Sequence, residues 1–331
     1  MTRRSLDARI ARFALAKPFR IARGVKTEAT TLEVRIQEGD CFGWAEAVPY
    51  PRYGETPEQA LALLEQVRPQ IEAGADRDTL ASLLPPGAVR NALDCALWHL
   101  EAQRRGTPVY ALAALPPPEP VETALTISID TPERMAAEAA QAAAQTLAPL
   151  LKIKLDAEMA VERITAVHRA APAARLILDA NESWTPSILQ AVCAVAAENG
   201  AVLIEQPLPA GADQALVRGQ SPVPICADES CHTHDDLAFI APRYDAVNIK
   251  LDKCGGLTEA IALYRAARAL DLEVMVGCMV GSSLAMAPAM LLAGFADYVD
   301  LDGPLLLAED RADGLASFGQ RLYPPVAALW G

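Results

Sequence analysis

From about residue 120 onward, short apolar runs alternate with alanine-rich stretches of helical character. Strands that alternate with helices in this way form right-handed βαβ units, and their strands are parallel. Eight units of similar length favour a closed barrel over an open sheet. The eight runs with strand character are 122–128, 150–155, 175–180, 201–206, 223–228, 245–251, 272–277 and 296–302.

The chain changes character after the last of these runs. Residues 303–310 read "GPLLLAED", and no eighth helix follows. Seven helical segments, including 132–147, 158–170, 185–198 and 257–270, lie between the eight strands. The fold class expected is therefore α/β, with a modified (β/α)7β barrel similar to a TIM barrel.

Residues 1–118 have a different pattern. Segments 5–15, 18–24 and 29–39 alternate polar and apolar residues as antiparallel strands do, and helical patterns follow at 56–74 and 86–106. The proline-rich stretch 114–121 serves as a linker. We expect an α+β capping domain over 1–118, completed by the tail 315–331, and a barrel domain over 119–314 that carries the functional residues.

Charge and cysteine usage exclude several classes of function. The net charge of −13 and the sequence pI near 4.8 disfavour binding to nucleic acid or to an anionic membrane. No apolar run approaches the roughly 20 residues that span a bilayer. The seven cysteines are scattered, odd in number and never in a C-x-x-C pair, which is typical of reduced thiols. We therefore expect a cytoplasmic protein.

The second barrel strand contains two lysines in an otherwise apolar run, "LLKIKLD" (150–156). Side chains of a strand alternate between its faces, so Lys152 and Lys154 share one face. Two unpaired ammonium groups in a barrel interior would be costly. The sequence must therefore supply negative charge close to them.

Three carboxylates meet this requirement. Asp179, Glu205 and Asp228 each stand near the C-terminal end of a strand, on three successive strands. Barrel active sites form at that edge. Carboxylates that converge there repel one another unless a cation lies between them, and ligation by oxygen alone suits Mg²⁺.

A third lysine completes the arrangement. Lys250 ends the sixth strand, across the barrel from Lys154. A metal that binds a substrate carboxylate stabilises the enediolate formed when the α-proton leaves. A lysine on each side could remove that proton from one face and return it to the other.

The motifs that contain these residues resemble the enolase superfamily, in its muconate-lactonizing-enzyme subgroup. The resemblance implies that Asp179, Glu205 and Asp228 bind one Mg²⁺ and that Lys154 and Lys250 are the acid/base pair. It also implies that Lys152 contacts the substrate carboxylate. The motifs are "KIK" (152–154), "LDAN" (178–181), "IEQP" (204–207), "ADES" (227–230) and "NIKLDKCGG" (248–256).

Other segments narrow the expected substrate. Asp300 and Asp302 in "DLDGP" share a face and suit a substrate ammonium group, and Arg23 in "PFRIARG" suits a second carboxylate. Asn181 and Glu229 adjoin metal ligands and are expected to support them. These residues, with "PYPRYGE" (49–55) and "GCMVGSS" (277–283), resemble the dipeptide epimerases.

The expected activity is Mg²⁺-dependent epimerisation of the C-terminal residue of a dipeptide, of the L-Ala-D/L-Glu type, by 1,1-proton transfer. The resemblance also implies a role in murein-peptide metabolism. Within the superfamily the alternatives are o-succinylbenzoate synthase, muconate cycloisomerase and N-acylamino-acid racemase. From other classes they are a Schiff-base aldolase and a non-catalytic dipeptide-binding barrel. The sequence leaves the oligomeric state open, with a homo-oligomer among the alternatives.

Overall fold

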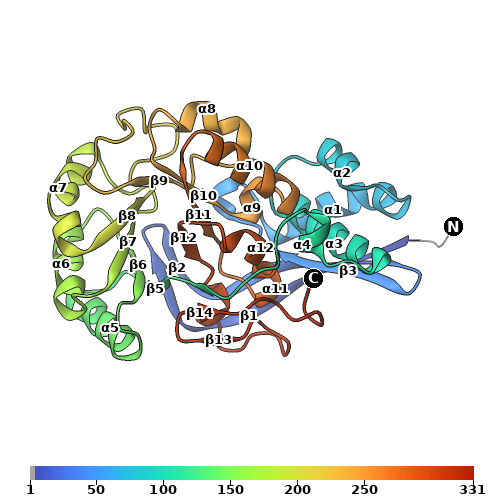
Figure 1. Cartoon of the computed structure of the whole chain (residues 1–331), viewed down its shortest axis with the longest axis horizontal. Coiled ribbons are helices and arrows are strands. Elements are labelled where there is room, and N and C mark those ends of the chain that lie inside the picture. Colours follow the sequence, from blue (N-terminus) through green and yellow to red (C-terminus); the bar gives the residue numbers. More distant parts are fainter. Residues whose placement is uncertain (1–3) are drawn as a thin grey trace.

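Eight parallel strands form the larger sheet of this computed structural model, which describes residues 4–331 (Figure 1). The first and last of them are joined where Ala124 N donates to Val299 O at 2.8 Å, so the sheet is nearly closed. The predicted barrel and its number of strands are confirmed. In sheet order the strands are β12 (Tyr298–Asp300), β11 (Glu273–Gly277), β10 (Ala246–Ile249), β9 (Ile225–Ala227), β8 (Ala201–Glu205), β7 (Arg175–Asp179), β6 (Leu150–Lys154) and β5 (Leu125–Ile127).

Helices and short helical turns lie in six of the seven connections between the strands. The expected seventh helical segment is wrong, because the connection between β8 and β9 contains no helix among the described residues. Several of the helices begin as their sequence suggests; at α5, for example, the Thr131 side chain accepts a hydrogen bond from Arg134 N. After β12 there is only a 3₁₀ turn, η4 (Gly303–Leu306), as expected from the missing eighth helix. The helical elements between the strands are α5 (Pro132–Gln145), α6 (Ala160–Ala170), α7 (Pro186–Ala196) with η2 (Ala197–Asn199), η3 (His234–Asp236) with α8 (Leu237–Ile240), α9 (Leu251–Cys254) with α10 (Leu257–Ala269), and α11 (Ser283–Met286) with α12 (Met290–Ala293).

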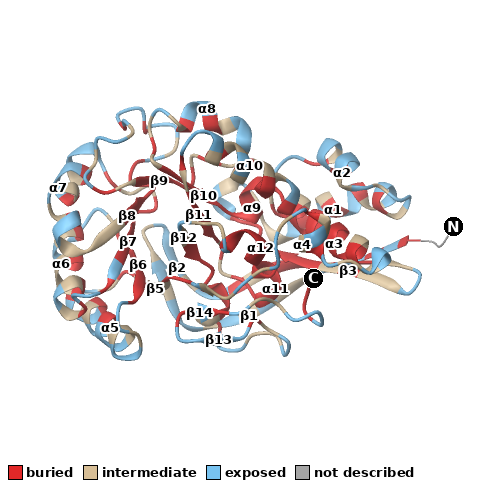
Figure 2. Ribbon diagram, in the orientation of Figure 1, coloured by how far each residue is buried: buried red, intermediate tan, exposed pale blue. Residues whose placement is uncertain are grey.

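The strands of the barrel are largely buried (Figure 2). A separate layer of buried side chains lies in the barrel interior, one from or next to each of several strands. Because the strand period is two, residues two and four positions further along a strand point to the same interior. The layer therefore sets which side chains reach the C-terminal mouth. Its members are Ala124, Leu150, Ile177, Leu203, Cys226, Ala246 and Met275.

A three-stranded antiparallel sheet with helices packed against it precedes the barrel. Its first strand differs from the expectation: the segments 5–15 and 18–24 do not form two strands, because β1 continues past Pro18 with a change of register between Ala14 and Phe19. An edge strand tolerates proline because its outer N–H needs no partner in the sheet. The elements are β1 (Arg4–Ile21), β2 (Gly24–Glu38), β3 (Cys41–Ala47), η1 (Pro51–Tyr53), α1 (Pro57–Glu72), α2 (Arg77–Leu83), α3 (Ala88–Arg105) and α4 (Val109–Leu112).

The β1–β2 hairpin extends from this sheet to the barrel mouth (Figure 1). Arg20 O accepts a hydrogen bond from Ile129 N at 3.1 Å, just beyond β5. Val48, which follows β3, donates its N–H to the buried Asp252 carboxylate of α9 at 2.8 Å. The antiparallel sheet is thus attached to the barrel beside the mouth.

The C-terminal tail contacts both parts of the chain. Strand β14 (Arg321–Leu322) pairs with β13 (Ser317–Phe318) and with β4 (Val121–Glu122), and Trp44 Nε1 donates to Leu329 O at 2.5 Å. We propose that a capping domain, 1–118 with 315–331, covers a barrel domain, 119–314. Residues 1–3 of that division lie outside the described residues.

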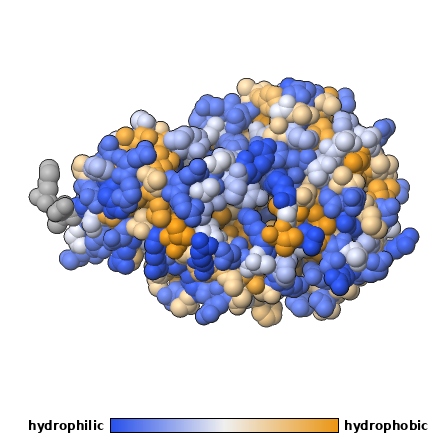
Figure 3. Space-filling view, turned by 180° about the vertical axis from the view of Figure 1, so that it is seen from behind, coloured by the Kyte–Doolittle hydropathy of each residue, from blue (hydrophilic) through white to orange (hydrophobic). Residues whose placement is uncertain are grey.

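One face of the molecule is mainly polar (Figure 3). The face seen in Figure 3 is mostly hydrophilic, with small hydrophobic patches between the charged side chains. Within residues 4–331, no helix combines the length and the apolar character that a bilayer crossing requires.

Candidate active site

The strand registers align the predicted residues side by side at the barrel mouth. Lys154 pairs in register with Asp179, and Asp179 with Glu205. Glu205 in turn pairs with Cys226, two residues before Asp228. The interior layer below them contains Leu150, Ile177, Leu203 and Cys226, so the period of two carries all four charged side chains into the interior.

Lys152 lies deepest and contacts three carboxylates. Its Nζ is 2.6 Å from Asp300 Oδ2, 2.7 Å from Glu205 Oε2 and 3.2 Å from Asp179 Oδ2. The side chain is only 1% exposed. Burial opposes its charge, but these carboxylates together raise the pKa of Lys152 well above its ordinary value. The negative charge that the buried lysines of the second barrel strand require is therefore present. Lys152 is a fixed cation at the base of the site.

The other two predicted lysines flank the carboxylates. Lys154 Nζ lies 2.5 Å from Asp179 Oδ2, and Lys250 Nζ lies 2.7 Å from Asp228 Oδ2 and 3.9 Å from Glu205 Oε1. Both side chains are buried at the mouth of the barrel and line the same cavity. A group held between them would face one ammonium on each side.

The three carboxylates differ in how well their charge is compensated. Burial opposes ionisation of Asp179, but Lys154 and Lys152 lower its pKa below the ordinary range. For Glu205, burial and the neighbouring Asp179 charge raise the pKa to about 7. The negative charge is therefore least well compensated at Glu205, and a further cation would be most stabilising there.

The residues fit a hard cation by their chemistry. Several oxygens at the site are buried and accept no hydrogen bond from any of the described residues: Glu205 Oε2, Asn181 Oδ1 and Glu229 Oε2. Glu205 Oε2 does lie near the Lys152 ammonium, but without hydrogen-bond geometry. Buried oxygens without donors are the ligands that Mg²⁺ prefers.

The lysines occupy the space between the carboxylates in this structure. Among residues 4–331, no three histidine, cysteine, aspartate or glutamate side chains are arranged to hold a metal ion. Lys152, Lys154 and Lys250 each form an ion pair with at least one of the predicted ligands. The ligand roles of Asp179, Glu205 and Asp228 therefore stay a prediction, supported by their shared location.

Asp300 and Asp302, here called the D-x-D pair, lie at the end of β12. Asp300 directs Oδ2 to Lys152, while its buried Oδ1 accepts no hydrogen bond from the described residues. Asp302 Oδ2 accepts a hydrogen bond from Thr126 N at 2.7 Å, across the seam of the barrel where β12 meets β5. Burial and the Asp300 charge raise the pKa of Asp302 to about 7. One free carboxylate oxygen thus faces the site where an ammonium group is expected.

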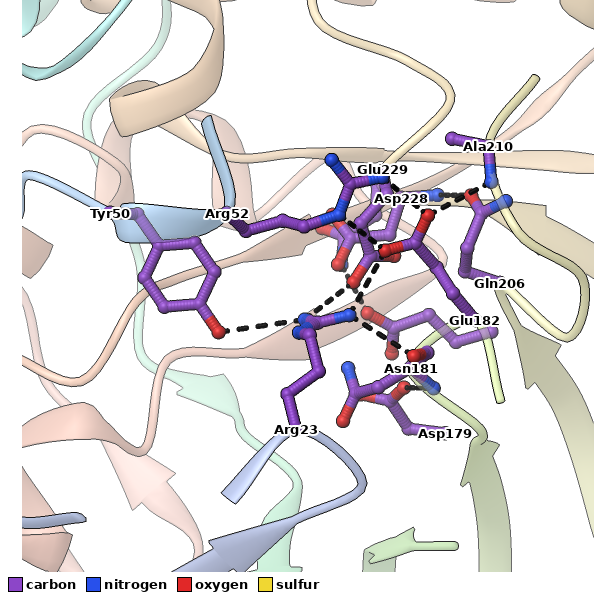
Figure 4. A network of polar contacts seen from close by, with 12 residues as sticks. Arg23, Tyr50, Arg52, Asp179, Asn181, Glu182, Gln206, Ala210, Asp228 and Glu229 are labelled. Carbon is purple, nitrogen blue, oxygen red and sulfur yellow. Dashed lines mark hydrogen bonds and ion pairs between the residues drawn. The ribbon is translucent and has the colours of Figure 1, made fainter. Parts of the chain in front are cut away.

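Arg23 lies in the two-residue turn of the β1–β2 hairpin, before Gly24, whose φ of 140° suits glycine. Its guanidinium points toward the barrel mouth (Figure 4). Nη2 lies 2.7 Å from Glu229 Oε1, and Nη1 contacts Glu182 Oε2 at 3.1 Å and Asn181 O at 3.0 Å. Arg23 therefore reaches the site, with its donors directed at protein groups.

The space enclosed by these groups is small. The cavity that Lys154 and Lys250 line measures about 50 Å³, and Phe19, Thr126 and Leu306 separate it from a larger one of about 370 Å³. A dipeptide needs more room than the smaller cavity offers. The structure therefore describes a closed arrangement, in which Arg23 of the hairpin turn and Tyr50 are among the residues that line the smaller cavity.

Sequence reasoning missed several residues that hold the site together. Lys253 Nζ lies 2.6 Å from Asp228 Oδ1, and it also donates to Asn248 O at 3.0 Å. Asn248 Nδ2 donates to Glu205 Oε1 at 2.9 Å. Asn248 stands two residues before Lys250, so the same-face argument applied to Lys152 and Lys154 could have found it. Nothing in the sequence alone indicated that Lys253 turns back to Asp228.

Comparison with known proteins agrees with this geometry. Residues 134–312 match the model of the enolase C-terminal domain-like family, and residues 5–113 match that of the mandelate racemase/muconate lactonizing enzyme N-terminal domain. The L-Ala-D/L-Glu epimerase of Escherichia coli is 48% identical over 296 residues, 89% of this chain and 92% of its own. An N-acetyl-D-glutamate racemase of a Pseudoalteromonas species is 44% identical over 300 residues, 90% of this chain and 94% of its own.

Solved structures of similar proteins contain a metal and a dipeptide. An enolase family member from Agrobacterium tumefaciens, with bound sodium and L-Ala-L-Glu, has a TM-score of 0.96 and 48% identity, covering 99% of this chain and 100% of its own. A dipeptide epimerase from Methylococcus capsulatus, complexed with Mg and L-Arg-D-Lys, has a TM-score of 0.88 and 33% identity, covering 98% and 97%. By its two family matches and its fold, this chain belongs to the enolase superfamily, in the mandelate racemase and muconate lactonizing enzyme family.

Proposed function

We propose that the protein is a Mg²⁺-dependent dipeptide epimerase that inverts the C-terminal residue of substrates of the L-Ala-D/L-Glu type. The observation that carries the proposal is the pair of buried lysines, Lys154 and Lys250, on opposite sides of a cavity that also contains the D-x-D aspartates. The epimerase relative from Escherichia coli and the dipeptide-bound structures support the same substrate class.

Each side chain has a distinct part in the proposed reaction. Lys154 and Lys250 exchange a proton with the α-carbon from opposite faces, while Lys152 remains a fixed cation beside the substrate carboxylate. Asp300 and Asp302 accept the ammonium group of the first residue. Asp179, Glu205 and Asp228 would hold Mg²⁺, with Asn181 and Glu229 beside them. The bound ion supplies positive charge for the carboxylate whose negative charge increases as the α-proton leaves.

The decisive test is exchange of the substrate α-hydrogen in D₂O, followed by NMR and mass spectrometry over a small dipeptide library. We expect deuterium at the α-carbon of the C-terminal residue, with appearance of the second diastereomer. Borohydride trapping of substrate on a lysine would instead indicate a Schiff-base aldolase. Binding without exchange would indicate a non-catalytic barrel. A cytoplasmic location stays a prediction of the sequence, and a role in murein-peptide metabolism stays what the resemblance implies. The oligomeric state stays open, with a homo-oligomer among the alternatives.

The D-x-D pair provides a more specific prediction. We expect Asp302→Asn to raise KM for L-Ala-L-Glu about 10- to 100-fold with little change in kcat, because one charge-assisted contact to the ammonium group is worth roughly 1.5–3 kcal/mol. Asparagine retains an oxygen for Thr126 N, so the seam of the barrel is preserved. Steady-state kinetics provide the measurement.

N-acetyl-glutamate is the matched control for this variant, because it has no ammonium group. Racemisation of N-acetyl-glutamate, where wild type shows it, should be unaffected by Asp302→Asn. Equal losses with both compounds would show that Asp302 acts on the fold of the site and not on the ammonium group. Preference of the wild type for the acetylated compound would favour an N-acylamino-acid racemase, the activity of one 44% identical relative.

A further inference from the structure

Gln206 directly follows Glu205 at the end of β8, and neither the proposed proton transfer nor the proposed metal coordination uses its side chain. This side chain is fully buried. The backbone φ of 34° lies in the left-handed region, which is uncommon for residues other than glycine. Such a backbone persists only where its surroundings fix it, and residues of this kind gather at functional sites. The contacts of Gln206 therefore indicate what it holds in place.

The amide of Gln206 reaches across from β8 to the segment that carries Asp228 and Glu229. Its Oε1 accepts hydrogen bonds from Asp228 N at 2.9 Å and from Ser230 N at 3.1 Å (Figure 4). Strand β9 ends at Ala227, so both N–H groups lie beyond the strand. One side-chain oxygen thus holds the main chain on both sides of Glu229, directly after the strand ends.

A buried aspartate determines which way this amide points. Asp213 Oδ2 accepts hydrogen bonds from Tyr244 Oη at 2.6 Å and from Ser230 Oγ at 2.7 Å. Because both hydroxyl protons are directed at Asp213, the two hydroxyl oxygens are left to accept. Gln206 Nε2 lies 3.0 Å and 2.9 Å from these oxygens, and 2.9 Å from Leu208 O. The NH₂ end must therefore face this side, and the carbonyl end must face the two backbone N–H groups.

A fixed main chain matters most where a side chain has to meet a metal ion. Mg²⁺ tolerates little departure from octahedral geometry, and groups that orient its ligands are worth about 10- to 100-fold in affinity. Without the Gln206 oxygen, the buried N–H of Asp228 would lose its partner, and the segment would shift to find another. The Asp228 carboxylate would then leave its place beside Lys250.

We propose that Gln206 is a positioning residue for the metal site. Through the main chain of residues 228–230 it fixes the direction of the Asp228 carboxylate, while Asp213 and Tyr244 fix the orientation of its own amide. The assignment rests on the proposed Mg²⁺-dependent function. Gln206 is not among the residues that line the cavity between the lysines. It should therefore change the affinity for Mg²⁺ more than the proton transfer that follows.

The test is calorimetric titration of Mg²⁺ into the metal-free protein, without substrate. Gln206→Met keeps the length of the side chain but loses the acceptor, and should raise the Kd for Mg²⁺ about 10- to 100-fold. Epimerisation by this variant should return toward the wild-type kcat as the Mg²⁺ concentration rises, which general damage to the fold would not allow. Tyr244→Phe is the milder variant. It removes one hydrogen bond to the amide and should raise the Kd about 2- to 10-fold.

The matched control is Gln320→Met. Gln320 is also buried and also bridges main-chain groups, but at the N-terminal end of β6: its Oε1 accepts from Leu150 N at 3.2 Å, and its Nε2 donates to Thr123 O at 3.1 Å. This variant should melt below wild type and bind Mg²⁺ with the same Kd. An unchanged Kd in Gln206→Met, or an equal increase in Gln320→Met, would overturn the assignment. If Gln206→Met does not fold, an unchanged Kd in Tyr244→Phe overturns it instead.

The assignment and the proposed function fail in different ways. If Mg²⁺ binding depends on Gln206 but wild type exchanges no α-hydrogen of any dipeptide in D₂O, the function fails and the assignment stands. If wild type epimerises dipeptides and Gln206→Met binds Mg²⁺ as tightly as wild type, the assignment fails and the function stands. A wild type that binds no Mg²⁺ rejects both.

Discussion

Replacing either of the proposed acid/base lysines, Lys154 or Lys250, should abolish epimerisation but leave proton exchange on one face of the α-carbon intact. We expect Lys154→Met and Lys250→Met each to lower kcat for epimerisation at least about 10²-fold, which is the low end of what a positioned acid or base contributes. Each remaining lysine still faces one side of the α-carbon. One variant should therefore exchange the α-hydrogen of only the L-configured substrate with D₂O, and the other that of only the D-configured substrate.

This complementary pattern is what separates two-base catalysis from its alternatives. Methionine preserves the length of the side chain, so the cavity changes little while the ammonium group is lost. Circular dichroism and thermal unfolding check that each variant folds. Lys17→Met serves as the control, because Lys17 is an exposed residue of β1 that pairs with Glu138 away from the site. If both variants lost exchange with both isomers, or if both retained it, Lys154 and Lys250 could not be acting on opposite faces.

Much of this site was predictable because a strand places alternate residues on one face. The pairs Leu150–Lys152, Ile177–Asp179 and Leu203–Glu205 each follow this rule, and parallel strands in register bring the second members together. The barrel was predictable for a different reason: eight strand segments alternate with helical segments in units of similar length. Local periodicity and the count of units together were enough to place the acids and lysines at one edge.

The ion pairs among these residues could not be predicted from periodicity. The sequence indicates only that carboxylates must lie near Lys152 and Lys154, whereas the structure shows which carboxylate each ammonium group contacts. Which partner each carboxylate takes depends on side-chain reach across the barrel, as for Lys152 and Asp300, 148 residues apart. The continuity of β1 was also missed, because a proline such as Pro18 usually ends a strand. An edge position and the change of register between Ala14 and Phe19 allow β1 to continue.

Removal of Mg²⁺ should abolish activity without unfolding the protein. The four buried lysines at the site, Lys152, Lys154, Lys250 and Lys253, form ion pairs with Asp179, Glu205 and Asp228 and thus replace the cation electrostatically. We expect EDTA to eliminate epimerisation, added Mg²⁺ to restore it, and circular dichroism to remain unchanged. Melting temperature should rise with Mg²⁺ concentration, because an ion that binds only the folded state stabilises it by RT ln(1 + [L]/Kd).

Lys253→Met tests whether the lysines are responsible for this metal-independent fold. Asp228 contacts both Lys250, at 2.7 Å, and Lys253, at 2.6 Å, so losing Lys253 leaves a buried carboxylate with half of its cationic partners. Breaking a buried ion pair costs about 3–5 kcal/mol, so the metal-free variant should melt well below wild type. Mg²⁺ supplies positive charge near the same carboxylate, and should raise the melting temperature of Lys253→Met more than that of wild type or of Lys17→Met. Unfolding of the wild type by EDTA alone, or equal Mg²⁺ shifts in all three proteins, would show that the lysines do not stand in for the metal.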